Sequence, residues 1–112
     1  MAKGDHIRRG VGRPERPLDP GDGPVAAFAH GLRELRRAAG SPSYREMAHH
    51  ALFAPSVLST AASGYRFPSL PVTLAYVKAC GGDRQKWCLR WHAVAALIDL
   101  PSGHHLQINC EG

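Results

Sequence analysis

Residues 43–64 read SYREMAHHALFAPSVLSTAASG, and this stretch decides the fold that we expect for the chain. Ser43 and Glu46 have the spacing of a capping box, which satisfies two orphan amides in the first turn of a helix. Pro55 suits the first turn of a following helix, where its missing N–H is no disadvantage, and Gly64 ends that helix. The stretch therefore predicts two short helices joined by a tight turn. The inward-facing residues of the first are expected to be Met47, Ala48 and Ala51.

Apolar residues recur at helical spacing on both sides of this stretch. Before it, the apolar face of one helix comprises Val25, Phe28, Ala29, Leu32, Leu35 and Ala39, whereas Arg33, Arg36 and Arg37 lie off that face. After it, a helix from about Leu70 to Cys80 precedes another that Asp83 caps and that places Trp87 and Trp91 in the core. The predicted fold class is all-α, a compact five-helix bundle.

The two ends of the chain lack such a pattern. Residues 1–24 combine Gly, Pro and interleaved charges with almost no large apolar side chains, so they cannot bury enough surface to become ordered. Residues 99–112 contain only scattered apolar positions. We expect a flexible, disordered N-terminal arm over residues 1–24, one helical domain over 25–98 and a loose C-terminal tail over 99–112.

Positive charge is concentrated in the predicted domain. The chain has a formal net charge of +5, and residues 25–98 hold nine basic against three acidic side chains. A compact domain with such an excess attracts polyanions, above all nucleic acid; the alternative is a basic surface that serves solubility. No apolar run approaches the roughly 18 residues of a membrane-spanning helix, so we expect a cytoplasmic protein without a membrane partner.

Catalytic and metal-binding patterns are missing from the sequence. It contains no nucleophile elbow and no phosphate-cradling loop. Cys88 and His92 fall four residues apart on a predicted helix, but two further ligands at sensible spacing are lacking. The sequence therefore predicts no enzyme activity, no catalytic residue, no metal ion and no cofactor.

Several strings of residues carry a family resemblance. The first three are Phe28-Ala-x-x-Leu32-Arg-x-Leu35-Arg36-x-x-x-Gly40, Pro42-Ser-Tyr-Arg-Glu-Met-Ala48 and Leu58-Ser-x-Ala61-x-Ser63-Gly64. The match continues through Leu70-Pro-Val-Thr-Leu-Ala-Tyr-Val-Lys-Ala-Cys-Gly-Gly-Asp83 to Trp87 and Trp91. On these strings, residues 25–96 resemble the Cro/C1-type helix-turn-helix domain, also called the xenobiotic-response-element (XRE) family, in its actinomycete form. The resemblance implies a lambda-repressor-like bundle that binds double-stranded DNA sequence-specifically, in a transcriptional regulator that associates with the nucleoid when bound to DNA.

The resemblance also implies which residues contact DNA. The base-reading positions in the major groove are Pro55, Ser56, Ser59 and Thr60. The phosphate-binding candidates are Arg36, Ser43, Tyr44, Arg45 and Arg66. A homodimer on DNA is compatible with this hypothesis. The alternative function is the same fold used as a protein-interaction or antitoxin-like adaptor module for an unknown protein partner, which an exposed apolar patch would favour.

Two positions depart from the family pattern. Leu52 stands in the turn where relatives usually have Gly, and a left-handed conformation there would destabilise the turn by roughly 1–2 kcal/mol. Ala54 stands where relatives usually have a Ser or Thr cap, which forfeits about 1 kcal/mol. We therefore expect either a looser turn than in relatives or a second helix that runs one residue further.

Overall fold

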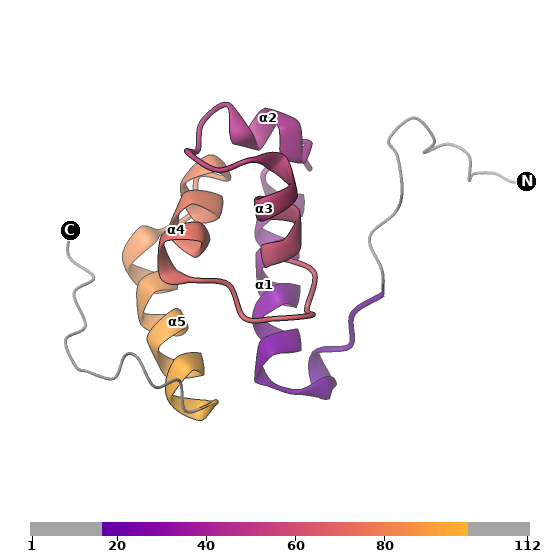
Figure 1. Ribbon diagram of the computed structural model, residues 1–112, viewed down its shortest axis with the longest axis vertical. Coiled ribbons are helices and arrows are strands. Elements are labelled where there is room, and N and C mark those ends of the chain that lie inside the picture. The colour runs from indigo at the N-terminus through magenta and orange to yellow at the C-terminus, as the bar shows by residue number, and fades with distance from the viewer. Residues whose placement is uncertain (1–16, 99–112) are drawn as a thin grey trace, which may run out of the picture.

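The computed structural model describes residues 17–98, and every regular element in that part of the chain is helical (Figure 1). A 3₁₀ turn, η2 (Pro20–Asp22), leads to α1 (Pro24–Ala38), α2 (Tyr44–Ala48), α3 (Pro55–Ala61), α4 (Leu70–Ala79) and α5 (Arg84–Leu97). The prediction of an all-α fold with five helices is confirmed for this range. Most of the predicted N-terminal arm (1–16) and the whole predicted tail (99–112) lie outside the described residues.

The three longest helices, α1, α4 and α5, pack against one another, and the two short helices cover them. In Figure 1, α2 lies across one end of the bundle and α3 lies in front of α1. Both short helices pack on each other and on α4. One side of α3 is left outside the bundle, where its side chains are exposed.

Short-range signals place the helix ends. Asp83 at the start of α5 accepts a hydrogen bond from the Lys86 amide at 3.2 Å, as predicted. Ser69 does the same for α4, where it accepts from the Val72 amide at 3.3 Å. After α1, Gly40 adopts a φ of 94°, a left-handed conformation that ends a helix without a clash from a Cβ atom.

One apolar core joins all five helices. Phe28 and Leu32 of α1 are almost wholly buried. The other buried members of this core are Met47, Leu58, Ala61, Ala62, Tyr76, Val77, Cys80 and Trp87. Because α2 and α3 are too short to be stable alone, their order depends on the residues that they contribute to this core.

Aromatic rings connect α1 and α5 with the segment between α3 and α4. The Phe28 ring lies edge-on to Trp87, with 5.4 Å between centroids, and to Phe67, with 5.2 Å. Trp91 stacks on Phe67 at 5.2 Å, and its indole N–H donates to the Pro68 carbonyl at 2.9 Å. The predicted core role of both tryptophans is confirmed, since Trp87 is 5% exposed and Trp91 packs against the core.

Two expectations about helix faces and one about the length of a helix are wrong. Arg33, expected off the apolar face of α1, is buried. Ala39, expected to face inward, is exposed because it caps α1 just before the helix stops at Gly40. Ala51 lies beyond α2, although it still packs against the core. After Ala48 the chain tightens, with the Ala51 amide donating to the Ala48 carbonyl at 3.3 Å, which ends the α-helix early.

The burial of Trp87 leads to a first prediction. Replacing Trp87 with Ala should lower the free energy of unfolding by about 3–5 kcal/mol, because the change removes a large ring from a packed core. Replacing Leu89, which is 52% exposed on the same helix, should lower it by about 1 kcal/mol or less. Urea unfolding of both variants measures the difference. Equal losses would show that the Trp87 ring is not a core anchor.

Candidate nucleic-acid interface

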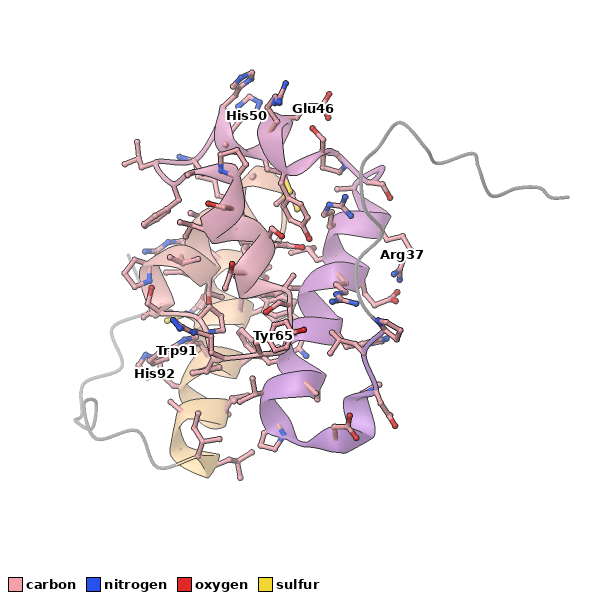
Figure 2. The ribbon with its side chains drawn as sticks, turned by 45° about the vertical axis from the view of Figure 1, so that its right-hand side comes forward. Arg37, Glu46, His50, Tyr65, Trp91 and His92 are labelled. Atoms are coloured by element: carbon pink, nitrogen blue, oxygen red, sulfur yellow. The ribbon has the colours of Figure 1, made fainter. Side chains whose placement is uncertain are left out.

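A capping box fixes the start of α2. The Ser43 hydroxyl oxygen accepts from the Glu46 amide and a Glu46 carboxylate oxygen accepts from the Ser43 amide, each at 3.0 Å. The predicted capping box is confirmed, and it engages the hydroxyl of one phosphate-binding candidate. The next candidate along α2, Arg45, is exposed. Figure 2 shows Glu46 and His50 at the end of the molecule that α2 forms.

The connection between α2 and α3, residues 49–54, contains no left-handed residue. In the described part of the chain, Ser41 is the one non-glycine residue with a positive φ, of 54°. The Leu52 side chain is 97% exposed. The left-handed conformation that would strain Leu52 is therefore not adopted. The expected extension of the preceding helix is wrong, because α2 ends at Ala48, and the alternative of a looser turn than in relatives stays a prediction.

The short helix α3 presents small side chains to solvent. Pro55 occupies its first turn, and Ala54 at the N-cap makes no side-chain hydrogen bond, as predicted. Its inner face buries Leu58 and Ala61. Of the predicted base-reading residues, Pro55, Ser56 and Thr60 are exposed and Ser59 is half-buried. Since residues three and four apart share a helix face, Ser59 and Thr60 each lie next to Ser56.

A buried arginine of α1 holds the other end of α3. The Arg33 Nε atom donates to the Ala62 carbonyl at 2.7 Å, and Arg33 is 8% exposed. Ala62 is the C-cap of α3, where carbonyls lack partners within the helix and the helix dipole is negative, so a cation is favourable there. The contact attaches α3 to α1 at a defined point.

Sequence reasoning missed this arginine, although one signal was present. Ala26 and Ala29 precede Arg33 by seven and four residues, so all three lie on the same side of α1. Both alanines are buried. Small side chains on one side of a helix indicate that another segment approaches closely, and here that segment is the end of α3.

Arg36 and Tyr44, two phosphate-binding candidates, contact each other within the protein. Arg36 Nε donates to the Pro42 carbonyl at 2.9 Å, and its guanidinium carbon lies 4.5 Å from the centre of the Tyr44 ring. The Tyr44 hydroxyl lies 3.4 Å from that of buried Tyr76. Burial raises the pKa of Tyr76 far above its ordinary value, Tyr44 raises it further, and the Arg36 charge lowers it. These contacts tie the end of α1 to α2 and α4.

The remaining candidate, Arg66, is exposed in the connection between α3 and α4. With Ser56 and Thr60, Arg66 lines a surface hollow of about 340 Å³ between α3 and the start of α4. The structure thus brings two predicted base-reading residues and one predicted phosphate-binding residue to a single surface feature. Figure 2 shows Tyr65, the neighbour of Arg66, in this connection.

No family model, no curated protein and no solved structure matches the chain. Within residues 17–98, no helix combines the length and the apolar character needed to cross a membrane. In the same range, no three His, Cys, Asp or Glu side chains are grouped so that they could hold a metal ion. What this surface binds therefore has to be inferred from its geometry and charge.

The contact between Arg33 and Ala62 leads to a second prediction. The variant Arg33→Met keeps an unbranched apolar side chain out to about the position of Nε but leaves the Ala62 carbonyl without its donor, so the free energy of unfolding should fall by about 1–3 kcal/mol. Hydrogen exchange of the α3 amides should accelerate. The matched control is Arg37→Met, because Arg37 is exposed and pairs with Glu34 on the surface. This variant should change the free energy of unfolding by no more than about 0.5 kcal/mol. Equal effects in the two variants would contradict an anchoring role for Arg33.

The raised pKa of Tyr76 leads to a third prediction. The group is neutral in both states at pH 8, but above its ordinary pKa of 10.0 the unfolded chain loses the proton that the folded protein keeps. The free energy of unfolding should therefore fall by up to about 1.4 kcal/mol per pH unit from this group alone. Burial also raises the pKa of Cys80, which adds to the fall in the same direction.

Urea unfolding between pH 8 and 11 measures this fall. Tyr76→Phe removes the titrating group and should flatten the dependence on pH. The control Tyr65→Phe, at a position that is 74% exposed, should keep the wild-type slope. Parallel curves for Tyr76→Phe and the wild type would exclude Tyr76 as the source.

Proposed function

We propose that the protein binds double-stranded DNA sequence-specifically, as a transcriptional regulator of the Cro/C1 helix-turn-helix type, with α3 in the major groove. The observation that carries the proposal is the placement of α3. Its inner face is anchored in the core, whereas Ser56 and Thr60 face solvent. Exposed arginines occur on both adjoining segments, Arg45 in α2 and Arg66 in the α3–α4 connection.

The dimensions of α3 support this placement. An α-helix with its side chains is about 10–12 Å in diameter, which matches the roughly 12 Å width of the major groove, and the seven residues of α3 make about two turns. Short side chains let the helix approach the base edges. The hydroxyls of Ser56 and Thr60 can donate or accept hydrogen bonds, and the Thr60 methyl can contact a thymine methyl. Because each such contact discriminates weakly, a homodimer that reads two half-sites would strengthen specificity.

Charge supports phosphate binding around this helix. Residues 25–98 hold nine basic and three acidic side chains, and Arg45 and Arg66 are exposed. We assign the main phosphate contacts to these two arginines, since arginine presents a planar set of donors that matches a phosphate. Arg36 and Tyr44 contact each other and also contact Pro42 and Tyr76, so these two phosphate-binding candidates also position the start of α2.

A protein-interaction or antitoxin-like adaptor function is the second candidate. The observation that favours it is the 97% exposure of Leu52 in the α2–α3 connection. On α5, Leu89 and Leu97 are also exposed, at 52% and 71%. Single exposed leucines are common on the surfaces of monomeric proteins, so they weigh less than the placement of α3.

A fourth prediction separates phosphate contacts from base contacts. Selection from random duplex DNA first gives a preferred site, and titrations at several salt concentrations then compare that site with a random duplex. Arg45→Ala or Arg66→Ala should weaken binding to both duplexes alike and reduce the slope of log affinity against log salt by about 1. Lys86→Ala should change neither the affinity for the two duplexes nor the salt slope, because Lys86 is exposed on α5, the helix that packs on α1 and α4.

Thr60→Ala should act differently in the same titrations. It should reduce the difference in binding free energy between the preferred and the random duplex by no more than about 1–3 kcal/mol, because one base contact is lost. The salt slope should stay unchanged. Absence of salt-dependent duplex binding by the wild-type protein would exclude the DNA-binding function. The protein-interaction or adaptor function would then replace DNA binding as the proposed function.

A further inference from the structure

The hollow beside α3 combines an apolar lining with a single positive charge. Val57, Phe67 and Val72 supply apolar surface. Ser56 and Thr60 add hydroxyl groups, and Arg66 adds the guanidinium. The described residues that line this hollow include no acidic side chain. An apolar cavity with a few convergent polar groups is the usual form of a small-molecule site.

One wall of the hollow is held in place by contacts behind it. The Phe67 ring packs edge-on against Phe28 and is stacked with Trp91, each at 5.2 Å between centroids. The carbonyl of the next residue, Pro68, accepts from the Trp91 indole N–H at 2.9 Å. Because these contacts within the protein hold the wall, binding does not have to order it, which lowers the entropic cost of association.

Size and charge indicate the class of ligand. A cavity volume of about 340 Å³ is roughly twice that of an engineered cavity, of about 150 Å³, that holds benzene. The space therefore suits one or two fused rings. The single guanidinium of Arg66 matches one carboxylate, to which it can donate two parallel hydrogen bonds. We propose that this hollow binds a small aromatic monocarboxylate, with its ring against Val57, Phe67 and Val72 and its carboxylate on Arg66.

Occupancy of the hollow has a consequence that rests on the proposed DNA-binding function. Ser56 and Thr60 line the hollow and are also proposed base-reading residues, and Arg66 is a proposed phosphate contact. A ligand seated there covers the groups that would meet DNA. The two ligands are therefore mutually exclusive, and the aromatic acid releases the protein from DNA by direct competition.

The first arm of the test uses no DNA. The probe 2-naphthoate is titrated into the full chain, and binding is measured by calorimetry and by methyl NMR shifts at Val57 and Val72. The matched probes are 2-naphthamide, which keeps the rings without the charge, and acetate, which keeps the carboxylate without the rings. We expect the naphthoate to bind roughly five- to tenfold more tightly than the amide and acetate to show no binding at the same concentrations.

Two arginine variants identify the partner of the carboxylate. Arg66→Gln should bind the naphthoate about as weakly as the wild type binds the amide. Arg37→Gln, at an exposed position on α1 outside the hollow, should bind it like the wild type. Circular dichroism checks that both variants fold. The proposal is overturned if the wild type does not bind naphthoate, if acid and amide bind equally, or if the two variants behave alike.

The second arm adds the preferred DNA duplex. Naphthoate should raise the apparent dissociation constant for DNA in the wild type by the factor 1 + [naphthoate]/Kd, where Kd is its own dissociation constant from the first arm, and 2-naphthamide should raise it less. A ternary complex would overturn the exclusion while leaving the ligand site intact. A protein that binds naphthoate in the first arm but no duplex in the second would refute the proposed function and keep the site.

Discussion

The hydrogen bond from Arg33 to the Ala62 carbonyl is the contact on which the exposed face of α3 depends. This helix has seven residues, no charged side chain and no side-chain cap at its start, so local interactions cannot keep it ordered. Leu58 and Ala61 fix its distance from the core, and Arg33 fixes its C-terminal end. Together these contacts define the helix axis and therefore the direction in which its outer side chains point. If this hydrogen bond were broken, the buried Arg33 cation would lose an acceptor and the buried Ala62 carbonyl would lose its donor. Both groups therefore favour the structure in which the bond is made.

A second set of contacts restrains the segment that connects α3 to α4. The Ser63 hydroxyl donates to the Thr60 carbonyl at 2.7 Å and accepts from the Tyr65 amide at 3.1 Å. Gly64 between them has a φ of 84°, which a residue with a Cβ rarely adopts. Two residues after Arg66, the Pro68 carbonyl is held by the Trp91 indole. The backbone on both sides of Arg66 is thus restrained, and its guanidinium extends from a defined place next to α3.

The sequence predicted those parts of the fold that depend on neighbouring residues. The capping box at Ser43, the cap at Asp83 and the stop at Gly40 each involve residues within four positions, so spacing alone reveals them. The burial of Arg33 depends on a carbonyl 29 residues away, and only a pair of alanines indicated it.

The candidate site was also predictable only in part. A family resemblance transfers positions along the chain, which placed Ser56 and Thr60 on an exposed helix face. It does not transfer side-chain conformations, so it could not show that Arg36 and Tyr44 pair with each other. Their contacts with DNA stay predictions.

The inner and outer faces of α3 differ in what the fold requires of them. Leu58 and Ala61 are core residues, whereas neither Ser56 nor Thr60 belongs to the core. Substitutions at exposed positions without a structural partner usually change stability by less than about 0.5 kcal/mol. Mutation and selection can therefore alter the chemistry of the outer face one residue at a time while every intermediate stays folded. A change of what this surface recognises needs no compensating change in the core, so proteins with this backbone could diverge in specificity much faster than in structure.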